Sequence, residues 1–131
     1  MAELDEYPRI YVSGPLSMGD TQANIKIAID VASTLLRMGS TPILPHLTHY
    51  WDLVRPENYE TWIQYDMRLV RCCHALYRIP GESPGADREV GLAKRLRLPV
   101  LGDSVQAREF IADYRRLMYH ANAMGGAPCG D

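Results

Sequence analysis

Four short apolar runs alternate with longer helical patterns along this chain, and that order constrains its fold more than any other feature. The runs are rich in β-branched and aromatic residues and are bounded by Pro or Gly: RIYVSG (9–14), TPILP (41–45), ALYRIP (75–80) and RLPVLG (97–102). Runs of this kind are typical of buried strands. Strands that alternate with helices form parallel βαβ units with right-handed crossovers. The sequence therefore predicts an α/β fold, a three-layer Rossmann-like (flavodoxin-like) parallel sheet of four or five strands flanked by helices.

The helical patterns occupy residues 21–39, 58–73, 84–97 and 104–120. The first has one apolar face and ends at Gly39, which suits the residue just past a helix end. That face carries Ile25, Ala28, Ile29, Ala32, Leu35 and Leu36. We expect residues 1–120 to form a single domain. The end of the chain, 121–131, is small, Gly-rich and without periodicity, which predicts a flexible tail.

The composition points to a small-molecule partner. The chain has 131 residues, of which 47% are hydrophobic and 23% charged, as expected for one soluble domain. A net charge of -2 and the lack of a basic stripe or polybasic run argue against a nucleic-acid polymer or a membrane as partner. The start, MAELDEYPRI, has no signal-peptide pattern, and no run approaches the length of a membrane span. We expect a cytoplasmic protein.

The cysteines and histidines give no strong metal or disulfide signal. Two of the three cysteines are adjacent, which is a poor disulfide framework. Cys72, Cys73 and His74 lack the two-residue spacer of zinc motifs, and His46 and His49 lack a third ligand. Packing at a helix end is the favoured interpretation of the first group, and a loop or substrate groove that of the second. No metal or other cofactor is predicted.

Two acidic residues interrupt apolar helix faces. Glu89 lies three residues after Ala86 and four before Ala93, so it shares their stripe. Asp66 falls in a similar stripe, with the 4-3-4 spacing of Trp62, Asp66, Leu69 and Cys73. A buried, unpaired carboxylate is costly, so each residue either lies on a solvated face or has a function. If the two converge, they suit a nucleophile and a general acid.

Ligands of open α/β sheets bind beyond the carboxyl ends of the strands. The segments at those ends are YVSGPLSMGD (11–20), PHLTHYWDLV (45–54) and PGESPGADRE (80–89). In the third, Ser83 suits an N-cap and Pro84 the first helical position, and such a helix start attracts anions. Ser83 can equally act as a cap alone. Tyr11 either donates its hydroxyl to one of the carboxylates or packs as an ordinary strand residue.

Three segments together resemble the nucleoside 2-deoxyribosyltransferase superfamily. They are IYVSGPLS, WIQYDMRLVRCCHALYRIP and SPGADREVGLAKRLRLPVL, and they span roughly residues 9–101. In motif the chain is most similar to the 2′-deoxynucleoside 5′-monophosphate N-hydrolases and related small phage and bacterial proteins. The resemblance implies that Glu89 is the nucleophile at the sugar C1′, that Tyr11 orients it, and that Asp66 assists departure of the base. It also implies that Gly14 lets the first loop approach the sugar or phosphate.

The resemblance also suggests how the phosphate binds. Transferases that use free nucleosides have an acid six residues before the nucleophile, where this chain has Ser83, as the monophosphate hydrolases do. Ser83 and Gly85 would then hold the phosphate. The hydrolases carry an arginine in the first loop, whereas GPLSMGD has none, so Ser17 and backbone N–H groups take that part.

The expected function is therefore hydrolysis of the base–sugar bond of a (deoxy)nucleoside 5′-monophosphate through a covalent glycosyl-enzyme. One alternative is a deoxyribosyltransferase, in which a second base intercepts the same intermediate. Another is a nucleotide-binding or sensing module without turnover. The resemblance further implies a homodimer, formed through the helices at 58–73 and 84–97, in which a neighbouring subunit closes the site.

Overall fold

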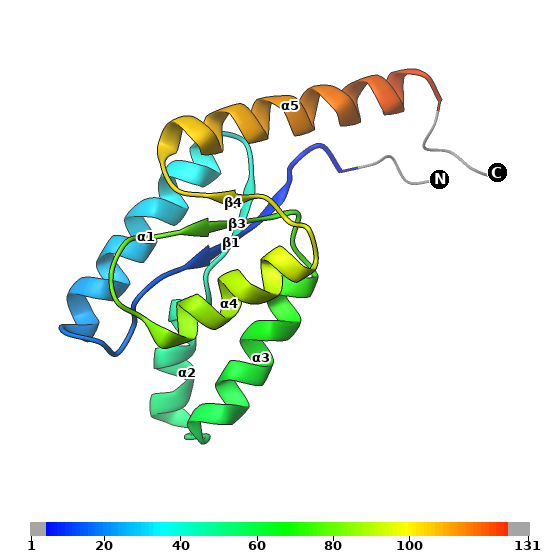
Figure 1. Cartoon of the computed structure of the whole chain (residues 1–131). Helices are drawn as coiled ribbons and strands as arrows, with labels where there is room; N and C mark the ends of the chain where they lie inside the picture. Colours follow the sequence, from blue (N-terminus) through cyan, green and yellow to red (C-terminus); the bar gives the residue numbers. More distant parts are fainter. Residues whose placement is uncertain (1–4, 126–131) are drawn as a thin grey trace.

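The computed structural model describes residues 5–125 and contains all four predicted strands and all four predicted helices (Figure 1). In chain order the elements are β1 (Arg9–Ser13), α1 (Thr21–Arg37), β2 (Thr41–Ile43), a 3-10 helix (Pro45–Leu47), α2 (Thr48–Val54), α3 (Tyr59–Arg71), β3 (Ala75–Arg78), α4 (Pro84–Arg95), β4 (Val100–Leu101) and α5 (Ser104–Ala123).

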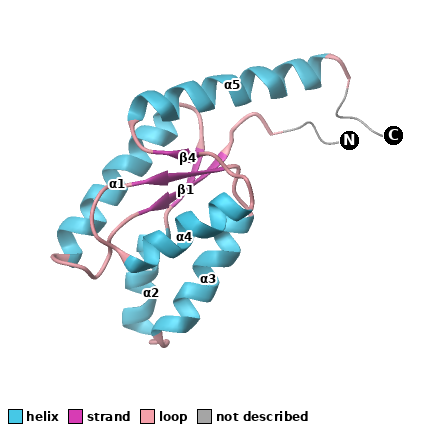
Figure 2. Cartoon of the chain, in the orientation of Figure 1, coloured by secondary structure: helices cyan, strands magenta, loops and turns pink. Residues whose placement is uncertain are grey.

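The four strands form one parallel sheet in the order β2-β1-β3-β4. Figure 2 shows the sheet with helices on both of its sides. Tyr11 of β1 is in register with Ile43 on one side and with Leu76 on the other. The chain leaves β1 toward β2 and later returns to the opposite side of β1 to form β3. The strand order therefore reverses between β1 and β3, which is where ligands bind in open α/β sheets. The predicted α/β fold is confirmed.

Alternation along β1 builds the two sides of the core. Ile10 and Val12 pack with α1 and α5 on one face of the sheet, whereas Tyr11 packs with α3 and α4 on the other. Each fully buried aliphatic side chain of this kind stabilises the fold by about 1.5–3 kcal/mol. Because the side chains of a strand alternate with a period of two, Ser13 follows Tyr11 onto the α3 and α4 face.

Helix starts are set by capping side chains. Those of Asp20, Asn58, Ser83 and Asp103 each accept a hydrogen bond from a backbone N–H three residues later. The predicted N-cap at Ser83, with Pro84 at the first helical position, is confirmed. Gly39 follows the end of α1 with a φ of 99°, a conformation that favours glycine.

The core-facing stripe of α1 is narrower than the sequence predicts. Ile25, Ala28 and Leu35 are buried, but Ile29 is 40% exposed and Leu36 is 61% exposed. A helix that covers a sheet on one side buries only the residues nearest its contact line. Ile29 and Leu36 lie one residue past that line, about 100° around the helix.

Two segments differ from the sequence prediction. The stretch after β2 was not predicted to be helical, yet it forms the 3-10 helix and α2. α5 continues to Ala123, three residues beyond its predicted end and into the predicted tail. Residues 126–131 of that tail lie outside the described residues. Between residues 5 and 125, no helix is both long enough and apolar enough to cross a membrane.

Candidate active site

A cavity of about 520 Å³ lies at the carboxyl ends of β1 and β3, a size typical of small-molecule sites. Its walls come from the loop after β1, from α2, from α3 and from the start of α4. They include Gly14, Ser17, His49, Asp52, Tyr59, Trp62, Ile63, Asp66, Ser83 and Gly85. All four residues predicted to bind substrate, Gly14, Ser17, Ser83 and Gly85, therefore line the same cavity as Asp66.

Glu89 lies behind this wall and is held at both carboxylate oxygens. The Tyr11 hydroxyl donates to Oε2 at 2.7 Å, and the Ser13 hydroxyl donates to Oε1 at 2.8 Å. Glu89 is only 5% exposed, which confirms its predicted inward orientation. The predicted contact with Tyr11 is also confirmed. Ser13 was not predicted; its place two residues after Tyr11 on the same strand is the signal that identifies it.

Both oxygens of Glu89 accept hydrogen bonds from hydroxyl groups, an arrangement that suits a carboxylate. Burial, the largest effect, raises the pKa of Glu89 above its ordinary value, and the hydrogen bonds from Tyr11 and Ser13 and the nearby charge of Arg78 offset part of that rise. Burial and the Glu89 charge raise the pKa of Tyr11 well above its ordinary value, so the phenol keeps its proton and remains a donor. Hydrogen bonds to an ionised acceptor are stronger than neutral ones and fix its orientation.

Asp66 differs from Glu89 in its hydrogen bonding, because one of its carboxylate oxygens has no partner among the described residues. It lines the cavity, and its Oδ1 is buried without a hydrogen-bond partner within the described residues. Burial, followed by the charge of Glu89, raises the pKa of Asp66 to about 8. Asp66 therefore carries a proton at neutral pH. Two neighbouring acids in such unlike environments are typical of sites that use one as an acid and the other as an anion.

The start of α4 offers fewer free donors than expected. The Ala86 N–H bonds to Ser83 Oγ at 3.1 Å, Pro84 has no N–H, and the Asp87 N–H bonds to the Ser83 carbonyl at 2.9 Å. Within the described chain, this leaves one first-turn N–H, that of Gly85, together with the hydroxyl proton of Ser83. The anion attraction predicted for this helix start therefore depends on one backbone N–H and one hydroxyl group.

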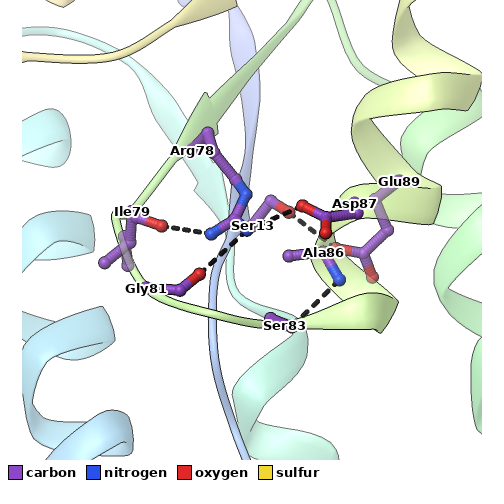
Figure 3. A network of polar contacts seen from close by, with 8 residues as sticks. All are labelled: Ser13, Arg78, Ile79, Gly81, Ser83, Ala86, Asp87 and Glu89. Atoms are coloured by element: carbon purple, nitrogen blue, oxygen red, sulfur yellow. Dashed lines mark hydrogen bonds and ion pairs between the residues drawn. The ribbon is translucent and has the colours of Figure 1, made fainter.

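Arg78, at the end of β3, stabilises the turn that leads into α4. Its guanidinium donates to the carbonyls of Ile79 and Gly81, the latter at 3.0 Å, and to Asp87 Oδ1 at 2.9 Å (Figure 3). These contacts tie the strand, the turn and the first turn of α4 into one unit. Ser83 and Glu89 are carried by that unit, so Arg78 is a positioning residue that sequence reasoning missed.

The loop after β1 packs tightly against the neighbouring strand. A Cβ on Gly14 would lie 2.8 Å from Ile79 Cβ, so this position excludes any larger residue for reasons of packing alone. His46 is buried beneath the loop, with Nε2 3.1 Å from the Pro15 carbonyl. Ser17 is exposed at the cavity rim. No Lys or Arg lines the cavity in the part of the chain that is described.

The wall opposite α4 is formed by α2 and the start of α3. Asp52 Oδ1 accepts hydrogen bonds from Trp62 Nε1 at 2.7 Å and from the Glu57 N–H at 2.9 Å. These bonds, the Glu57 one first, lower the pKa of Asp52, which is ionised at neutral pH. Trp51 packs edge-on against Trp62 at a centroid distance of 5.1 Å. Among residues 5–125, no group of three His, Cys, Asp or Glu side chains is arranged to hold a metal ion.

Comparison with known proteins identifies a family but no function. The sequence profile of a domain of unknown function, DUF7768, matches residues 8–102. No curated protein matches the sequence. The matched residues run from β1 to β4 and include every side chain of the candidate site. The similarity to the nucleoside 2-deoxyribosyltransferase superfamily stays a prediction. Since the profile covers well over half of the chain, the protein belongs to the DUF7768 family.

Proposed function

We propose that the protein cleaves the N-glycosidic bond of a (deoxy)nucleoside 5′-monophosphate through a covalent intermediate on Glu89. The observation that carries this proposal is the pair of unlike acids, Asp66 in the cavity wall and Glu89 directly behind it. Glu89 is buried and held by two hydroxyl donors, and Asp66 has a pKa of about 8 beside it. A nucleophilic carboxylate and a proton donor are the two groups that a retaining cleavage of a glycosidic bond requires.

In the first step, a Glu89 carboxylate oxygen bonds to C1′ as the bond between C1′ and the base nitrogen breaks. The electron pair of that bond leaves with the base, which takes the proton of Asp66. In the second step, water attacks C1′, its proton passes to the Asp66 carboxylate, and Glu89 leaves as a carboxylate. Tyr11 and Ser13 orient Glu89 for attack and stabilise its charge when it leaves.

A site used only for binding would gain nothing from this arrangement. Burying Glu89 and an unpartnered Asp66 oxygen costs folding free energy. Such costs are typical of sites whose acids are adjusted for reaction. This supports turnover over the alternative of a nucleotide-sensing module.

The proposal is tested by incubating the protein with a panel of nucleosides and nucleoside 5′-monophosphates and separating the products. Free base with a sugar 5-phosphate supports hydrolysis. Transfer of the sugar to an added second base identifies a deoxyribosyltransferase instead. Binding without any product in the whole panel overturns the catalytic proposal.

The phosphate is assigned to the Ser83 hydroxyl, the Gly85 N–H and Ser17, and Ser83→Asp tests this. Aspartate is also a good N-cap, so α4 is expected to form normally. The added charge repels a phosphate. It is expected to raise the activation free energy for kcat/KM with a monophosphate by about 2–4 kcal/mol, and that with the free nucleoside by much less. Because no Lys or Arg among residues 5–125 lines the cavity, we expect the wild-type ratio of monophosphate to nucleoside kcat/KM to exceed one only modestly. A wild-type ratio below one, or a ratio unchanged by Ser83→Asp, contradicts the assignment.

We also propose that the protein is a cytoplasmic homodimer. The sequence predicts a contact through the helices at 58–73 and 84–97, and the adjoining helix α2 carries a run of exposed apolar side chains at Trp51, Leu53 and Val54. These residues border the cavity wall that holds Asp52, so a second copy at this face would help to enclose the substrate. Light scattering is expected to give twice the chain mass of 14.8 kDa, and Leu53→Asp to give one chain mass. A wild-type monomer at micromolar concentration contradicts the proposal.

A further inference from the structure

One turn above Asp66 on α3, two side chains lead to different walls of the cavity. Ile63 faces α4, since a Cβ on Gly85 would lie 3.7 Å from Ile63 Cδ1. Trp62 faces α2, since its Nε1 donates to Asp52. Trp62 precedes Asp66 by four residues, about 6 Å along the helix axis. These two side chains therefore connect Asp66 to two separate walls of the cavity, one at Gly85 and one at Asp52.

In the proposed function, the sugar lies at Glu89 and Asp66, and the phosphate at Ser83 and Gly85. The base, which takes its proton from Asp66, then extends along the remaining wall toward α2. Trp62 lines that side of the cavity and offers aromatic surface to a base. The distal edge of the base then meets Asp52 of α2, which is hydrogen-bonded to Trp62, the residue one helical turn from Asp66.

The carboxylate of Asp52 lines the cavity in a fixed orientation. Its Oδ1 already takes both the Trp62 and the Glu57 donors, which fixes the orientation of the carboxylate. In the described part of the chain, no hydrogen bond is seen to Oδ2. A carboxylate oxygen offers only acceptor sites, so it attracts an N–H donor and repels a carbonyl oxygen.

We infer that Asp52 recognises the exocyclic amino group of the base, so that the site selects amino-bearing bases over their keto counterparts. Adenine against hypoxanthine and cytosine against uracil are the relevant pairs. Within each pair the amino group is replaced by an oxygen of nearly the same size. A preference within a pair therefore reports the polarity of the hydrogen bond and not the shape of the pocket. This inference rests on the proposed function, because it places the base by reference to Asp66.

The test compares the 2′-deoxynucleoside 5′-monophosphates of adenine and hypoxanthine in wild type and Asp52→Asn. A hydrogen bond to a charged group supports a wild-type preference for adenine of about tenfold to a hundredfold in kcat/KM. In Asp52→Asn, the amide carbonyl keeps the bonds from Trp62 and Glu57, which leaves the amide NH₂ in the place of Oδ2. A donor then faces the substrate, so the preference is expected to reverse toward hypoxanthine.

Glu60→Gln serves as the matched control. Glu60 is a surface carboxylate of α3 that does not line the cavity, and its removal changes the net charge by the same amount. This variant is expected to keep the wild-type preference for adenine. Thermal melting of all three proteins checks that each is folded.

The outcomes separate the inference from the proposed function. Base release without a preference in the wild type, or with one that Asp52→Asn leaves unchanged, overturns the inference and leaves the proposed function standing. If neither nucleotide loses its base, the proposed function fails, and calorimetry decides the inference. A tighter dissociation constant for the adenine nucleotide that Asp52→Asn abolishes supports the inference. Equal dissociation constants overturn it.

Discussion

Glu89→Gln is expected to raise the activation free energy that corresponds to kcat/KM by about 3–6 kcal/mol, which is close to complete loss of turnover. The amide is nearly the same size as the carboxylate and still pairs with the Tyr11 and Ser13 hydroxyls, so the fold is retained. What is lost is the negative oxygen that bonds to C1′. Base release under saturating substrate, measured beside a melting curve, checks both halves of this expectation.

The control for Glu89→Gln is Glu60→Gln, which removes an exposed carboxylate from the neighbouring helix α3. It is expected to retain wild-type turnover, so that a loss in Glu89→Gln is not an effect of net charge. A folded Glu89→Gln protein that keeps most of its rate shows that Glu89 is not the nucleophile.

Asp66→Asn is expected to slow the reaction by about 10²–10⁴-fold, because the base then leaves without a proton. The wild-type rate needs protonated Asp66, whose pKa is raised to about 8, so kcat/KM is expected to fall as pH rises through about 8. This alkaline decline disappears in Asp66→Asn. A substrate with a cationic base such as 7-methylguanine, which leaves unprotonated, is expected to lose much less. An equal loss for both kinds of substrate contradicts the role of Asp66 as an acid.

The same substitution is expected to stabilise the fold at alkaline pH. The folded-state pKa of Asp66 lies above its ordinary 3.8, so the folded protein binds more protons than the unfolded chain between about pH 4 and 8. The wild type therefore loses stability across that range as pH rises. Asp66→Asn avoids this loss, and its free energy of unfolding at pH 8.5 is expected to exceed that of wild type by about 2–4 kcal/mol, allowing for partial solvation in the cavity.

Urea unfolding of wild type and Asp66→Asn at pH 4.5 and 8.5 gives the comparison. The difference between the two proteins is expected to be larger at pH 8.5, and Asp113→Asn, at an exposed ion pair on α5, is expected to show no such trend. A difference that is independent of pH contradicts the raised pKa of Asp66.

Site residues whose positions follow the period of a helix or a strand could be predicted from the sequence. Glu89 shares the stripe of Ala86 and Ala93, and all three are buried against the sheet. Ser83 was identified as an N-cap because its residue type and the proline after it suit that position. These features depend on local geometry, which a few neighbouring residues determine.

The remaining features depend on how distant segments pack, and periodicity carries no information about that. The contact between Asp52 and Trp62 requires α2, whose start has no capping side chain and whose apolar residues are largely exposed. Arg78 acts on the carbonyls of Ile79 and Gly81, whose orientation is set by the path of the turn and not by residue type. Likewise, the spacing of Asp66 predicts that it faces inward, but its closeness to Glu89 follows from the packing of α3 against α4.

The most direct test of the covalent mechanism is mass spectrometry of the acid-quenched protein during turnover. Asp66→Asn with 2′-deoxy-7-methylguanosine 5′-monophosphate is the most suitable combination. The cationic base leaves without a proton, so the first step is slowed little. The second step is slowed more, because asparagine cannot take the proton of the attacking water. We expect a mass increase equal to one deoxyribose phosphate residue, located by peptide mapping at Glu89, and no such increase in the Asp66→Asn, Glu89→Gln double variant. Release of base without any adduct at Glu89, or an adduct on another residue, contradicts a glycosyl intermediate on Glu89.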